Sequence, residues 1–207
     1  MSEVKDINVS EILREIIDDA YYEKLRAKRP RTREEKLNHL IEVLKRVKPL
    51  EERNKTRFYM DNWVYIPGSD SDDEEVTDEI RDCGFSGCAL GWASTDPVFR
   101  AMGLVNDGES IWFEPCGPID NPEESSFEGL ESGMHLLDLN RAEAEFLFIP
   151  TSYYVRDIKT NLDLKRSFGE LTETNPTLFY NRKFRRISVS KVIKRIEFVR
   201  DNPSVLS

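Results

Sequence analysis

Three cysteines and one histidine, Cys83, Cys88, Cys116 and His135, are the residues of this chain best suited to chemistry. Three thiolates and one imidazole are a legitimate ligand set for zinc. Structural zinc sites, however, usually draw their ligands from two close pairs, whereas four residues separate Cys83 from Cys88 and no second tight pair follows. The alternative is that the cysteines pack as small apolar side chains. We expect no resident cofactor, with zinc as the alternative.

Cys88 could also act as a nucleophile. It is predicted to lie near the start of a short helix capped by Ser86, where backbone amides and the helix dipole favour a thiolate. His135 could serve as the base, oriented by Asp138 or Asn140. The sequence holds no phosphate-binding loop, dinucleotide fingerprint, HExxH motif or serine elbow. The pairing of Cys88 with His135 makes a cysteine-dependent hydrolase one hypothesis, and a non-enzymatic role is the other.

The charge of the chain is unevenly distributed. Residues 1–60 carry a net charge of +3, residues 61–150 a net charge of −18 and residues 151–207 a net charge of +6. Such asymmetry affects partner choice and association rate, although basic ends that fold back onto an acidic middle would neutralise it. We expect an exposed acidic loop at residues 68–82 to be the binding surface. Its densest part consists of Asp70, Asp72, Asp73, Glu74 and Glu75.

The basic segments are a weaker indication of nucleic-acid binding than the acidic middle is of protein binding. Residues 179–186 interleave aromatic and cationic side chains, as single-strand binders do. The net charge of −9 opposes tight binding to a phosphate backbone. No apolar run is long enough for a membrane span, and the N-terminus lacks a signal sequence, so we expect a cytoplasmic protein without a membrane partner. The cations that would contact a nucleic acid are Arg182, Lys183, Arg185 and Arg186.

Helical patterns dominate the two ends of the chain. Capping residues at Asn8 and Thr32 open two helices, which Pro30 and Pro49 are expected to end. We expect residues 1–50 to form an antiparallel helical hairpin. The apolar face of the first helix comprises Ile12, Leu13, Ile16, Ile17, Ala20 and Leu25, and that of the second comprises Leu37, Leu40, Ile41, Leu44 and Val47.

Residues 51–207 are predicted to form the main body, so that the whole chain is one α+β domain, mainly α-helical with a small antiparallel β element. Residues 104–105 and 111–113 flank an Asn-Asp-Gly turn, which favours a β-hairpin. Residues 58–66 are predicted to be extended, and residues 151–187 to be rich in loops. Further helices are expected at residues 88–93, 124–138 and 140–149 and from Val189 onward.

Several short motifs make the chain resemble a group of small proteins from bacteria and tailed bacteriophages that has no established activity. The group's pattern begins with Phe-x-Met-x-x-Trp and Cys-Gly-Thr-x-x-Cys-x-x-Gly-(Trp/His)-Ala, and the likeness covers roughly residues 37–200. Phe85 replaces the usual threonine, Cys83 and Cys88 are one residue further apart than in some members, and residues 69–80 resemble an insertion. The matching positions are Phe58, Met60, Trp63, Cys83, Gly84, Cys88, Gly91, Trp92, Ala93, Asp96, Pro97, Phe99, Leu137, Leu139, Glu143, Ala144, Leu147, Phe148, Arg195 and Ile196.

The resemblance implies a phage or mobile-element origin and a shared fold, and it carries over no catalytic residue. Together with the acidic middle, it leads us to expect a non-enzymatic accessory protein that binds another protein and modulates a host factor. A component of a virion or another large assembly is an alternative, as is the hydrolase built on Cys88 and His135.

Overall fold

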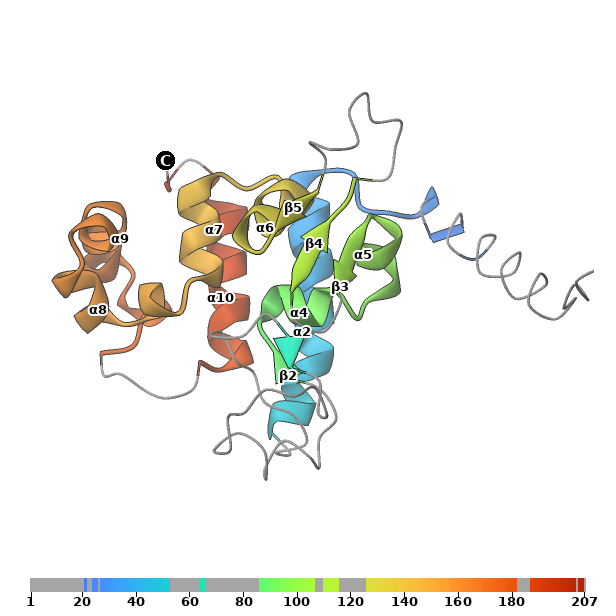
Figure 1. Ribbon diagram of the computed structural model, residues 1–207. Helices are drawn as coiled ribbons and strands as arrows, with labels where there is room; N and C mark the ends of the chain where they lie inside the picture. Colours follow the sequence, from blue (N-terminus) through green and yellow to red (C-terminus); the bar gives the residue numbers. More distant parts are fainter. Residues whose placement is uncertain are drawn as a thin grey trace, which may run out of the picture.

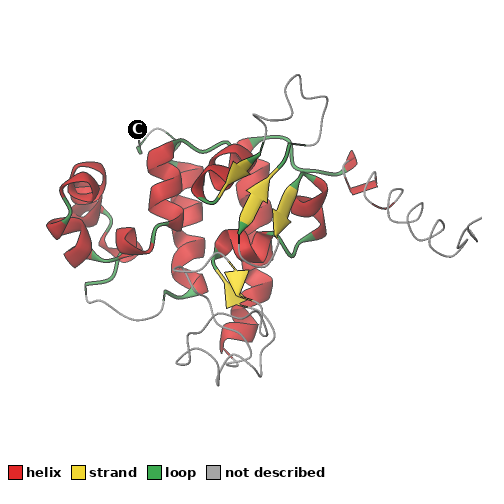
Figure 2. Cartoon of the chain, in the orientation of Figure 1, coloured by secondary structure: helices red, strands yellow, loops and turns green. Residues whose placement is uncertain are grey.

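The chain folds as an α+β protein in which helices surround a small antiparallel sheet, as the sequence predicts (Figure 2). The computed structural model describes residues 21, 24–25, 27–52, 64–65, 86–106, 110–115, 126–181, 187–203 and 205–206. The helices are α2 (Arg33–Glu52), α4 (Ala89–Ala93), α5 (Pro97–Ala101), α6 (Leu130–Leu137), α7 (Arg141–Phe148), α8 (Val155–Thr160), α9 (Leu162–Thr174) and α10 (Val189–Asp201), with 3-10 turns η2 (Pro150–Tyr153) and η3 (Pro176–Leu178). The strands are β1 (Val64–Tyr65), β2 (Ser86–Gly87), β3 (Leu104–Asn106), β4 (Ile111–Phe113) and β5 (Phe127–Glu128).

Helix α2 is the central support of the molecule. The predicted capping box is confirmed, because the amide of Glu35 donates to Thr32 Oγ1 over 3.2 Å and the Glu35 carboxylate accepts from the amide of Thr32 over 3.1 Å. The apolar face of α2 is buried against α10 and α4. The helix runs past Pro49 to Glu52, so the predicted stop is wrong. A proline this close to the helix end removes one backbone hydrogen bond of the last turn, and the helix continues past it. Most of the first predicted helix lies outside the described residues.

The three-stranded sheet has the order β3-β4-β5 and is antiparallel throughout. The predicted hairpin is confirmed, with Leu104 opposite Phe113 and Asn106 opposite Ile111. The helix predicted for residues 124–138 begins only at Leu130, because Phe127 and Glu128 pair with β4 instead. Gly129, whose φ is 57°, then turns the chain from β5 into α6.

Residues 151–187, which we expected to be rich in loops, contain α8 and α9. The prediction missed a clear signal: Asn161 caps α9 by accepting from the amides of Asp163 and Leu164, and Leu164, Phe168 and Leu171 repeat at helical spacing and are buried. Ser86 was also misplaced, since it lies in β2 and Cys88 is the capping residue of α4. In Figure 1 the α8–α9 hairpin projects from one side of the body, while the sheet and α5 lie on the other side of α2 and α10.

Arg195 of α10 joins four segments inside the core. Its side chain has no solvent exposure, and its guanidinium group lies 3.5 Å from the ring centre of Tyr153 and 4.1 Å from that of Phe146. Its N–H groups donate to the carbonyls of Leu178, Phe146 and Ser152 at 2.9, 2.5 and 2.7 Å, and to Ser152 Oγ at 2.9 Å. Burial lowers the pKa of Arg195 to about 10, so the group remains charged at neutral pH. A single cation thus ties α10 to α7, η2 and η3.

We predict that Gly133→Ala destabilises the protein by about 1–3 kcal/mol, because small-to-large changes overpack a filled core. A Cβ atom at Gly133 would lie 2.7 Å from the ring of Phe148 and 2.9 Å from Leu90 Cδ1. Urea unfolding measures the loss. The matched control is Gly169→Ala in α9, where a Cβ would meet only Lys165 Cγ at 3.5 Å, and where alanine should stabilise the helix by about 0.5–1 kcal/mol. Equal effects of the two substitutions would contradict the close packing of α6.

Candidate functional site

Cys88 lies at the start of α4, as expected, but its environment opposes the chemistry expected of it. The side chain has no exposure, and it makes no capping hydrogen bond to the helix. Burial raises the pKa of the Cys88 thiol to about 11, which is the opposite of the shift predicted from the helix N-terminus. Desolvation of the thiolate outweighs the helix dipole here, so Cys88 is a protonated, apolar core residue at neutral pH.

His135, the proposed base, lies on the exposed side of α6. Its ring stacks on Phe127 with the ring centres 3.5 Å apart. The two residues proposed to orient it are engaged elsewhere: Asp138 pairs with Lys36 Nζ at 2.7 Å, and Asn140 caps α7 by accepting from the amide of Glu143. The described contacts give His135 an aromatic partner and a surface position.

The proposed zinc ligands are not assembled in the part of the chain that the structure describes. Within it, no group of three or more histidine, cysteine, aspartate or glutamate side chains could hold a metal ion. Cys83 and Cys116 lie outside the described residues, as do Asp70, Asp72, Asp73, Glu74 and Glu75 of the acidic loop and Arg182, Lys183, Arg185 and Arg186 of the basic segment. Among the described helices, none is long and apolar enough to cross a membrane.

Acidic side chains of the middle segment pair with basic residues of α2. Glu143, which is 2% exposed, accepts from Arg33 at 2.6 Å, and Asp138 accepts from Lys36 at 2.7 Å. Arg33 also donates to the carbonyl of Val199 in α10. Helix α2, part of the basic N-terminal segment, therefore packs against acids of the middle segment.

Asp96 is the most highly connected of these acids. Arg46 Nη2 donates to its Oδ2 over 2.6 Å, His39 Nε2 lies 2.8 Å from its Oδ1, and the amides of Val98 and Phe99 donate to the same Oδ1 at the start of α5. Burial alone would raise the pKa of Asp96, but the hydrogen bonds from His39 and Arg46 outweigh it and lower the pKa to about 2. The cluster fastens α5 to α2.

This cluster was not predicted from the sequence, although a signal was present. His39 and Arg46 are seven residues apart on α2, so they lie on one face of the helix, and the Asp96-Pro97 pair is typical of a helix start. Arg195 was noted from the sequence only as a position of the resemblance, because nothing in a single sequence distinguishes a buried arginine from a surface one.

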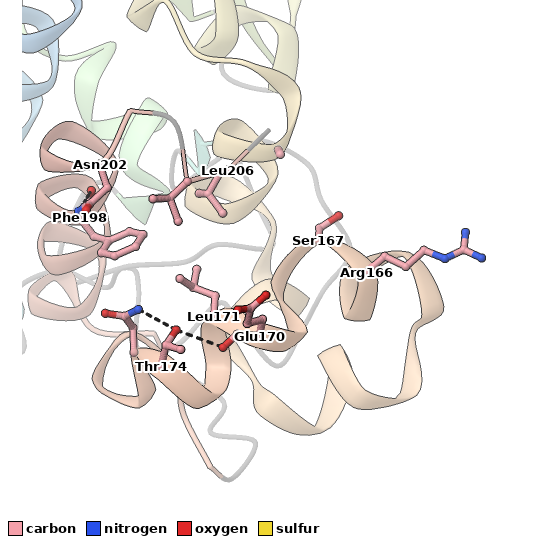
Figure 3. A pocket seen from close by; sticks show the side chains of 11 residues that line it. Arg166, Ser167, Glu170, Leu171, Thr174, Phe198, Asn202 and Leu206 are labelled. Atoms are coloured by element: carbon pink, nitrogen blue, oxygen red, sulfur yellow. Dashed lines mark hydrogen bonds between the residues drawn. The ribbon is translucent and has the colours of Figure 1, made fainter.

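A concave surface lies between α9 and the C-terminal end of α10, and we call it the α9–α10 cleft (Figure 3). Its volume is about 470 Å³. Leu171, Phe198 and Leu206 give it an apolar floor, and Arg166 and Glu170 are its only charged lining residues. An apolar floor with a polar rim is typical of clefts that hold small molecules or side chains of a partner. The lining includes no histidine or cysteine, and so it offers binding rather than nucleophilic chemistry.

Comparison with known proteins adds no relative: no protein-family model, no curated protein and no solved structure matches this chain.

We predict that Asp96→Asn lowers the free energy of unfolding at pH 7 by about 2 kcal/mol, from the difference between the folded and ordinary pKa values. Asparagine retains the capping function, so the variant isolates the charge. Because the folded pKa lies near 2 and the unfolded one near 4, the stabilisation is complete above pH 4 and is lost as the pH falls to 2.

Urea unfolding of both proteins between pH 2 and 7 measures this effect. Parallel curves for the wild type and Asp96→Asn would contradict it. Glu173→Gln, a substitution of an exposed acid on α9, serves as the control and should change neither the stability nor its pH dependence.

Proposed function

We propose that this protein is a non-enzymatic accessory protein of a phage or mobile element that acts in the host cytoplasm by binding another protein. The acidic residues Asp70, Asp72, Asp73, Glu74 and Glu75 make the contact. The partner carries a basic surface, because complementary charge accelerates association and selects against other partners.

The distribution of the acidic side chains supports this proposal. Most acids in the described part of residues 61–150 form ion pairs, whereas the excess negative charge lies in other segments. Of the 21 acidic residues in 61–150, seven are described. Four of these, Asp96, Asp138, Glu143 and Glu145, pair with cations. Within residues 61–150, the undescribed segments that hold the other 14 acids contain one basic residue, Arg81. A stretch so unbalanced within one chain favours an anionic binding surface over simple solubility.

The cysteine-dependent hydrolase receives less support from the same contacts. Its nucleophile would have to ionise at a position where burial raises the thiol pKa to about 11, and a substrate would have to reach a side chain with no exposure. A virion or large-assembly component remains the alternative role, and it uses the same acidic contact.

The test is recovery of the tagged protein from its host, with nuclease added, followed by mass spectrometry of the bound proteins at low and moderate salt. We predict one stoichiometric protein partner that is released as salt rises, because salt screens exposed charges. Replacing the five acids by Asn or Gln should weaken its binding at least about tenfold.

The control replaces three exposed acids of the described body: Glu131→Gln, Asp163→Asn and Glu173→Gln. It should leave the binding unchanged. Undiminished binding by the five-site variant would exclude the acidic loop as the contact, and co-sedimentation with virus particles would favour the assembly role.

A further inference from the structure

Another concave surface, which we call the basic groove, lies between the start of α2 and the sheet. Its volume is about 250 Å³. Three cationic side chains and no acidic one line it, although the net charge of the chain is −9. Figure 1 shows the blue segment that leads into α2 running beside the sheet. Arg29, Arg31 and Lys36 supply the charge, and Met102 and Phe113 line the apolar part.

Two of these cations are uncompensated. Arg29 and Arg31 are exposed, and within the described part of the chain neither guanidinium group forms an ion pair or a hydrogen bond. The neighbouring carboxylate of Glu35 accepts instead from the backbone amides of Arg31 and Thr32, at 2.7 and 3.1 Å. The side-chain charges of both arginines are therefore available to a ligand.

The third cation and the backbone of the groove are held in place. Lys36 Nζ lies 2.7 Å from Asp138 Oδ2, and the Lys36 side chain is only 13% exposed. Pro30 restricts the backbone between the two arginines, and the Glu35 carboxylate fixes the amide of Arg31. A preformed site of this kind reduces the entropic cost of binding.

Recognition in the groove is electrostatic. Met102 and Phe113 are 7% and 8% exposed, so they shape the groove and add little contact area of their own. A cleft that carries charges of one sign on low-dielectric walls concentrates the electric potential and attracts counter-ions. The groove therefore fits an anionic group.

The number of free charges distinguishes between anions. A phosphate monoester carries about 1.5 to 2 negative charges at neutral pH and three acceptor oxygens, which matches two free guanidinium groups. A carboxylate or a phosphodiester carries a single charge. The planar guanidinium group also donates to phosphate oxygens in pairs. The groove has the volume of about eight water molecules, so a phosphate group fits together with part of the molecule that carries it.

We propose that the basic groove binds a dianionic phosphate group. Arg29 and Arg31 donate to its oxygens, and Lys36, held by Asp138, adds a third positive charge beside them. The phosphate belongs to a small phosphate monoester or is free phosphate, and the two sources share this chemistry. The inference is independent of the proposed function, since it concerns a different segment of the chain.

The test is calorimetric titration of the full chain at low salt and pH 8 with ethyl phosphate, inorganic phosphate and diethyl phosphate. The two dianions should bind, and the singly charged diester should bind at least about tenfold more weakly. Arg29→Gln with Arg31→Gln should weaken binding of both dianions at least about tenfold. Both side chains are exposed, so this double variant should keep its fold, which circular dichroism verifies.

The matched control is Arg156→Gln with Arg166→Gln, which removes two exposed arginines from the α8–α9 hairpin and changes the net charge equally. It should leave the binding unchanged. Tighter binding of ethyl phosphate than of inorganic phosphate would identify a monoester site, the reverse order would identify a free-phosphate site, and both orders support the proposal. A wild-type chain that binds neither dianion at millimolar concentration would overturn it. Equal losses in the two double variants, or a diester bound as tightly as the dianions, would also overturn it.

Discussion

The buried guanidinium group of Arg195 is the interaction on which the arrangement of this protein depends. It has no carboxylate among its hydrogen-bond partners; three backbone carbonyls and the Ser152 hydroxyl satisfy it, and aromatic rings lie around it. Those carbonyls belong to α7, η2 and η3, and Arg195 pairs them inside the core, where the Phe146 carbonyl also accepts from the Ser152 hydroxyl over 3.1 Å. Because η2 and η3 lead to and from the α8–α9 hairpin, the same side chain sets the position of that hairpin and the shape of the α9–α10 cleft.

Ion pairs between the basic N-terminal part and the acidic middle segment hold the described body together. Helix α2 supplies Arg33, Lys36 and Arg46 to acids of the middle segment, and each pair links elements that are far apart in sequence. These contacts are short and partly buried, so salt screens them less than it screens exposed charges. Most of the acids of residues 61–150 lie outside the described residues, and our proposal assigns partner binding to the densest group of them.

The sequence correctly predicted the features that depend on interactions between neighbouring residues. The capping boxes at Thr32 and Asn140, the hairpin at residues 104–113 and the apolar face of α10 all arise from neighbouring residues. Residues 124–138 were assigned wrongly because strand pairing of Phe127 with Phe113 overrides helix propensity, and propensity is a weak prior. The environment of Cys88 was assigned wrongly because burial depends on the whole fold, whereas the helix position can be read from the sequence. The pairing of Asp96 with His39 and Arg46, and the hydrogen bonds of Arg195, arise from contacts across the fold.

The most direct test of this account is the unfolding free energy of Arg195→Met, compared with Lys194→Met on the exposed side of the same helix. Methionine fills much of the space but removes the Arg195 donor from the carbonyls of Ser152 and Leu178, while the carbonyl of Phe146 keeps the Ser152 hydroxyl. The account predicts a loss of about 3 kcal/mol or more for Arg195→Met, together with loss of amide protection at Tyr180, and little change for Lys194→Met. A loss below about 1 kcal/mol, with the amide of Tyr180 still protected, would show that the fold does not depend on this cation.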